Sequence, residues 1–73
     1  MMKICNNKQT GQVFVHLEKK DQKKSLMITP NGIVLALKYD MFTHPVEVEY
    51  DEALSNGVIN RAQYNMYSQY HLD

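Results

Sequence analysis

The chain has 73 residues and eight Lys and Arg against eight Asp and Glu, so its formal charge is zero with His neutral. This length predicts one small domain, residues 1–73, and excludes a doubly wound nucleotide-binding domain. No apolar run approaches the roughly 18–20 residues of a membrane-spanning helix. The single cysteine, Cys5, excludes an internal disulfide, so we expect a cytoplasmic protein with no membrane association.

The zero net charge hides a strong asymmetry along the chain. Residues 1–38 carry seven lysines against two carboxylates, which gives +5, and residues 39–73 carry one arginine against six carboxylates, which gives −5. The two halves either neutralise each other in the fold or form separate charged patches that dock partners.

The amino-terminal half is typical of antiparallel strands. Residues 1–9 are expected to form a flexible start. Gln12–Glu18 alternates in period two, with Val13, Val15 and Leu17 on one face and Phe14 and His16 on the other. The polar residues 19–24 predict an exposed hairpin loop, followed by a second strand over Ser25–Thr29.

A strong turn signal, Thr29-Pro30-Asn31-Gly32, separates the second strand from the third. Ile33–Tyr39 is apolar on both faces, which predicts the central strand of the sheet. Pro45 ends the irregular segment after it, and Val46–Tyr50 alternates again as a fourth strand. In that strand the valines and Tyr50 are expected to point inward and Glu47 and Glu49 outward.

The remainder of the chain, residues 51–72, predicts a helix or a helical hairpin. A short turn over Asp51–Ser55 is ended by Asn56-Gly57. Asn60 and Gln63 have the spacing of a capping box, so a longer helix is expected from Arg61 to about His71.

These elements predict an α+β fold. Residues 12–50 form a four-stranded, mostly antiparallel β-meander, curled toward a small SH3-like barrel, and the carboxy-terminal α-helix packs on one face.

Reactive side chains do not form a recognisable catalytic pattern. Cys5, His16, His44 and His71 lack the spacing of a metal site, so no metal and no cofactor are expected. Cys5 and His16 are weighed as a nucleophilic dyad, but nothing in the sequence lowers the pKa of the thiol. We therefore expect a protein that is not an enzyme.

The leading hypothesis is a small protein-binding module or inhibitor. It acts through an acidic strand and a tyrosine-bearing helix, because charged poles orient partners and tyrosine is enriched in interface cores. The candidate residues are Glu47, Glu49, Tyr50, Asp51, Glu52, Tyr64 and Tyr67.

The alternative is weak binding of single-stranded nucleic acid or RNA through the lysine-rich hairpin loop and an exposed aromatic strand face. The candidate residues are Lys19, Lys20, Lys23, Lys24, Phe14 and His16. A homodimer formed through the helix or an uncovered strand edge is a third possibility.

Overall fold

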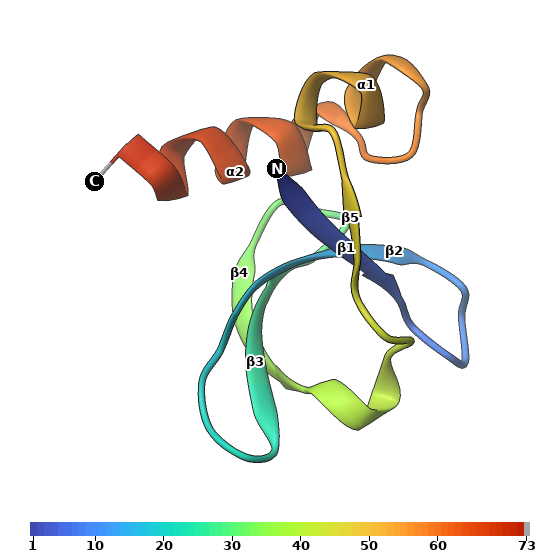
Figure 1. Cartoon of the computed structure of the whole chain (residues 1–73), viewed down its shortest axis with the longest axis vertical. Helices are drawn as coiled ribbons and strands as arrows, with labels where there is room; N and C mark the ends of the chain where they lie inside the picture. The colour runs from blue at the N-terminus through green and yellow to red at the C-terminus, as the bar shows by residue number, and fades with distance from the viewer. Residues whose placement is uncertain (73) are drawn as a thin grey trace.

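The computed structural model describes residues 1–72 and contains a five-stranded antiparallel sheet with two helices, so the α+β prediction is confirmed. The sheet order is β4-β3-β2-β1-β5 (Figure 1). The elements are β1 (Met2–Asn6), β2 (Val13–Lys19), β3 (Lys24–Ile28), β4 (Val34–Lys38), the 3₁₀ turn η1 (Tyr39–Met41), β5 (Val46–Val48), α1 (Tyr50–Ser55) and α2 (Arg61–Leu72).

The prediction of four strands and a flexible start is wrong, because residues 1–9 contain β1. This strand pairs antiparallel with both β2 and β5. Met2, Ile4 and Cys5 are all buried, so burial on both sides of the sheet holds β1 in place. Its short alternation, Met2 and Ile4 against Lys3, was the overlooked signal.

The segment predicted as the middle of the sheet lies at its edge. β4 pairs only with β3, and Ile33 and Leu35 are 53% and 45% exposed. The true centre is β2, because the unpredicted β1 adds on its far side.

The fourth predicted strand is shorter than expected. β5 ends at Val48, and Tyr50 begins α1 instead of continuing the strand. Val46 is 55% exposed rather than turned inward. The reason for the early end is Glu49, whose carboxylate accepts hydrogen bonds from the backbone N–H groups of Asp51 and Glu52 and so caps the helix.

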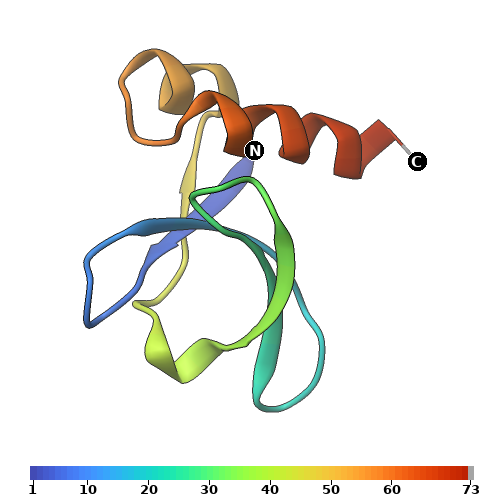
Figure 2. The same cartoon turned by 180° about the vertical axis from the view of Figure 1, so that it is seen from behind.

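Each face of the sheet has its own hydrophobic cluster. The larger one lies under the helices and contains buried residues of β1, β2, β3, α1 and the loop before α2: Met2, Ile4, Val15, Ile28, Ala53 and Ile59. The smaller one, on the opposite face, consists of Cys5, Phe14, Met27 and Phe42. Neither α1 nor α2 therefore lies on this second face of the sheet, as Figure 2 also shows.

The predicted capping box at the start of α2 is confirmed and also anchors the helix to the sheet. Gln63 N–H donates to Asn60 Oδ1 at 2.9 Å, and Asn60 N–H donates to Gln63 Oε1 at 3.1 Å. Gln63 Nε2 then donates to the Val13 carbonyl at 2.9 Å, and Asn60 Nδ2 to the Pro30 carbonyl at 2.7 Å. Two side chains thus fix the helix to β2 and to the β3–β4 turn.

The β3–β4 turn contacts α2 closely enough to require glycine. Gly32 has φ +82°, and a Cβ placed on it would lie 3.0 Å from both Cβ and the carbonyl oxygen of Ala62. Thr29 Oγ1 accepts from the Ile33 N–H and completes the turn.

Candidate functional site

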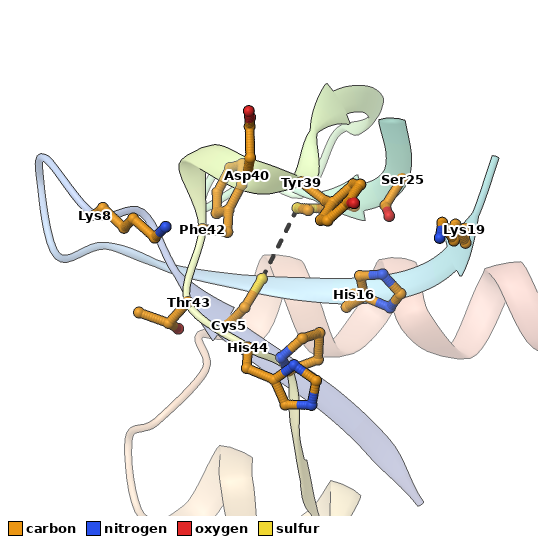
Figure 3. Close-up of a pocket in the computed structure, with 12 residues that line it drawn as sticks. Cys5, Lys8, His16, Lys19, Ser25, Tyr39, Asp40, Phe42, Thr43 and His44 are labelled. Atoms are coloured by element: carbon orange, nitrogen blue, oxygen red, sulfur yellow. Dashed lines mark hydrogen bonds between the residues drawn. The ribbon is translucent and has the colours of Figure 1, made fainter. Parts of the chain in front are cut away.

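A concave pocket of about 440 Å³ lies on the sheet face that the helices do not cover (Figure 3). The strands β1, β2 and β3 form its base, and the segment from η1 to Pro45 forms its wall. That segment is held against β1, because Thr43 N–H donates to the Asn6 carbonyl at 2.9 Å and Lys8 N–H donates to the Met41 carbonyl at 3.0 Å. The lining residues are Cys5, Lys8, His16, Lys19, Ser25, Met27, Tyr39, Asp40, Phe42, Thr43, His44 and Pro45.

Cations, imidazoles and one carboxylate, that of Asp40, surround an apolar floor in this pocket. Cys5, Met27 and Phe42 are 1%, 0% and 6% exposed. Figure 3 shows Lys8 and Lys19 at opposite ends of the pocket, with His16 and His44 between them. A cavity of this size lies within the range of roughly 300–1,000 Å³ that small-molecule sites occupy.

A β-bulge in β2 brings Lys19 to the pocket. Regular alternation would place Lys19 on the same face as Val15, under the helices. The pairing with β3 shifts between His16 and Glu18, so that Lys19 lies opposite Ser25, a pocket residue. Its Nζ lies 5.4 Å from the centre of the Tyr39 ring, a cation–π distance.

His16 has a buried ring nitrogen, Nδ1, for which no hydrogen-bond partner is found among residues 1–72. Burial lowers the pKa of His16 below its usual value, and the positive charge of Lys3 lowers it further. The imidazole is therefore neutral at pH 7, and one of its nitrogens is available as an acceptor.

Cys5 and His16 line the same pocket, as the nucleophilic dyad hypothesis required. However, burial raises the pKa of the Cys5 thiol to about 11, and the thiol donates to Met27 Sδ at 3.9 Å. The nucleophilic thiolate is thus a rare species at neutral pH. Cys5 contributes to the apolar floor of the pocket and is not an activated nucleophile.

The lysines of the predicted loop lie beside the pocket at one end of the molecule. We call the exposed residues Lys19, Lys20, Lys23, Lys24 and Lys38 the lysine end. Lys38 was not predicted; it joins the group because β4 pairs with β3 and places Lys38 directly opposite Lys24. Such a like-charge pair destabilises a sheet.

The loop between β2 and β3 holds its lysines in a defined turn. Asp21 Oδ1 accepts hydrogen bonds from the backbone N–H groups of Lys23 at 2.8 Å and Lys24 at 2.9 Å. These two bonds are the main reason that the pKa of Asp21 is lowered. The carboxylate organises the loop and leaves the lysine side chains exposed.

Of the aromatic residues predicted to contact nucleic acid, Phe14 is not available. It is 8% exposed and packs edge-on against Phe42, with ring centres 4.8 Å apart. The prediction that Phe14 lies on an exposed strand face is wrong, because η1 and the following residues cover that face. Tyr39 is the accessible aromatic ring of the pocket, at 43% exposure, and no sequence signal marks it beyond its place at the end of a strand.

The residues of the protein-binding hypothesis lie at the other end of the molecule, around α1 (Figure 1). Glu47, Asp51 and Glu52 are exposed, whereas the carboxylate of Glu49 is engaged in capping α1. In Figures 1 and 2 the β2–β3 loop and α1 lie at opposite ends of the longest axis. The loop lysines and the carboxylates of α1 are therefore far apart, although Lys3 lies opposite Glu47 and Asp40 lines the pocket with Lys19.

The tyrosines of that hypothesis contact one another. Tyr50 stacks on Tyr64 with ring centres 4.5 Å apart and lies 5.1 Å from Tyr67. Tyr64 donates to Asp51 Oδ1 at 2.8 Å, and this hydrogen bond is the main reason that the pKa of Tyr64 rises to about 12. Tyr50 also hydrogen-bonds Ser68. Much of the tyrosine ring area thus joins α1 to α2.

Two further findings concern residues 1–72. No three His, Cys, Asp or Glu side chains in this range lie close enough together to hold a metal ion. None of the helices in the same range has the length and apolar character needed to cross a membrane.

Comparison of the chain with protein-family models, with curated proteins and with solved structures gave no match. The chemistry of the pocket and of the charged ends is therefore the basis for assigning a function.

Proposed function

We propose that this protein is a non-enzymatic binding module for single-stranded nucleic acid, and that the lysine end and the concave pocket form its binding surface. The observation that carries the proposal is the gathering of five exposed lysines beside a pocket with an accessible aromatic ring. Lysines that follow a backbone and aromatic rings on which bases stack are the recurring parts of single-strand binding sites.

Charge separation supports this assignment. A net charge of zero disfavours nucleic-acid binding when charges of both signs are mixed. Here the carboxylates of α1 lie at the far end of the longest axis from the β2–β3 loop. Around the loop, Lys19, Lys20, Lys23 and Lys24 outnumber the carboxylates Glu18, Asp21 and Asp40, which leaves an excess of positive charge. The like-charge pair of Lys24 and Lys38 adds to it.

The architecture is compatible with such a role. We propose that the sheet, whose two edge strands β4 and β5 are joined by η1, is a small SH3-like barrel. An architecture of this kind does not define the ligand, which follows from the side chains of the site.

The test is fluorescence anisotropy with a labelled single-stranded oligonucleotide of about 12 nucleotides. Contacts to four phosphates predict a slope of log affinity against log salt of about −2.8, at roughly −0.7 for each phosphate. Lys23→Glu is expected to weaken binding and to reduce the slope to about −2.1.

Arg61→Glu is the matched control, because it changes the charge equally on an exposed helix position. It is expected to leave the slope unchanged. Absence of binding at about 50 mM salt, or equal losses in the two variants, would refute the proposal.

Protein binding through the acidic end is a second candidate, favoured by the separation of that end from the lysines. Glu47 and Glu52 are exposed at this end. The double substitution Glu47→Lys/Glu52→Lys is expected to abolish capture of a basic partner protein in a pull-down. Unchanged capture by the double variant would reject this surface.

A further inference from the structure

We propose that the concave pocket holds one unstacked base of the bound strand, with Tyr39 as its stacking wall, the His16 ring beside the base and Lys8 and Lys19 beside the flanking phosphates. This inference rests on the proposed function and adds to it the chemical group that the pocket receives.

The shape and polarity of the pocket suit a flat, largely apolar ring. Its floor consists of the buried side chains of Cys5, Met27 and Phe42, and Tyr39 stands at its wall with 43% of its surface exposed. Aromatic side chains bind bases of any sequence, because every base presents a π-face. Phosphate alone would gain nothing from such a floor.

His16 is a polar group of the pocket whose Nδ1 has no hydrogen-bond partner among residues 1–72. A buried polar atom without a partner is costly, and natural structures contain few of them. His16 Nδ1 is the one such side-chain atom found among residues 1–72, and it belongs to a residue that lines the pocket. The lowered pKa of His16 keeps the ring neutral, so that it offers one hydrogen-bond donor and one acceptor. The edges of nucleobases carry both donors and acceptors and can therefore pair with such a ring.

The cations lie where a strand would continue on either side of the bound base. Figure 3 shows Lys8 and Lys19 at the two ends of the pocket. Beyond Lys19, the chain leads directly into the β2–β3 loop with Lys20 and Lys23. A strand with one base in the pocket would therefore place its phosphates along the lysine end.

The experiment compares two probes of equal length and charge: an oligothymidylate of about 12 nucleotides and the same backbone without bases. Thymine offers an N–H donor on its edge. We expect the oligothymidylate to bind at least about tenfold more tightly, which corresponds to about 1.4 kcal/mol. Equal binding of the two probes overturns the base pocket but leaves the proposed function standing. Binding of neither probe refutes the proposed function itself.

A matched pair of variants assigns the difference to the pocket. Tyr39→Ala is expected to bind the oligothymidylate only as tightly as it binds the baseless probe. Its affinity for the baseless probe is expected to equal that of the unmodified protein. Tyr70→Ala removes the same ring from α2, outside the pocket, and is expected to keep the difference. If Tyr39→Ala still binds the oligothymidylate more tightly than the baseless probe by the full factor, the inference is overturned.

A measurement on the unmodified protein avoids any effect of substitution on folding. Thymidine monophosphate is expected to shift the NMR signals of the His16 ring, whereas ribose 5-phosphate at equal concentration is expected to leave them in place. Equal shifts with both compounds would show that phosphate alone occupies the pocket and would overturn the inference.

Discussion

Gln63→Ala is expected to destabilise the protein by about 2–4 kcal/mol. Gln63 is 2% exposed and connects α2 to β2 through its side chain. The substitution leaves the Val13 carbonyl and the Asn60 N–H, both part-buried, without their partner, and each such group costs about 1–2 kcal/mol. The better helix propensity of alanine returns only a few tenths of a kcal/mol. A domain of this length has a total stability of about 4–11 kcal/mol, so the loss is a large fraction of it.

Urea denaturation followed by circular dichroism measures the effect. The matched control is Gln69→Ala, which removes the same side chain from an exposed position of the same helix. We expect the control to change the free energy of unfolding by less than about 0.5 kcal/mol. If Gln63→Ala loses no more stability than Gln69→Ala, the anchoring role assigned to Gln63 is wrong.

Three further predictions test the turn and the two titratable groups of the pocket. Gly32→Ala is expected to cost at least about 1–2 kcal/mol more than Gly57→Ala by urea denaturation, because both residues have positive φ but only Gly32 lies against Ala62; equal losses would contradict the close contact. Because burial lowers the pKa of His16 in the folded protein, the unfolded chain binds a proton first as pH falls below about 6.5. Stability through this group is therefore complete above that pH and decreases as pH falls through the folded pKa, and an NMR titration midpoint at or above the usual value would disprove it. Cys5, with a pKa of about 11, is expected to react with a disulfide reagent at pH 8 about two to three orders of magnitude more slowly in the folded protein than in denaturant, and equal rates would contradict its burial.

Local signals were sufficient for the parts of the fold that depend on neighbouring residues. The capping box of Asn60 and Gln63 predicted the start of α2, and the turn at residues 29–32 predicted the β3–β4 hairpin. Both rest on hydrogen bonds between residues three or four apart, which any sequence reading can identify.

Features that depend on distant pairing were missed. β1 is a short strand, and only its pairing with β5, more than forty residues away, shows why its residues are buried. Without β1, the apolar run of β4 was taken for the centre of the sheet, although Leu35 is 45% exposed. Long-range pairing cannot be read from period-two alternation alone.

The candidate site shows the same division. The lysines of the β2–β3 loop were predicted from composition. The pocket beside them required the bulge after His16, which turns Lys19, and the return of residues 39–45 across the sheet, which brings Tyr39 and covers Phe14. A one-residue irregularity leaves no mark in the hydrophobic pattern.

The position of β5 has a consequence for how the chain opens. β1 to β4 are joined by short hairpins, whereas β5 is held to the sheet by three paired positions, Met2 with Val48, Lys3 with Glu47 and Ile4 with Val46. Closing that pair encloses most of the polypeptide in one loop, which makes it the slow event in assembly and the cheapest to reverse. Amide hydrogens of β5 are thus expected to exchange with solvent ahead of those of β2, because a transient release of β5 would leave the central hairpins intact.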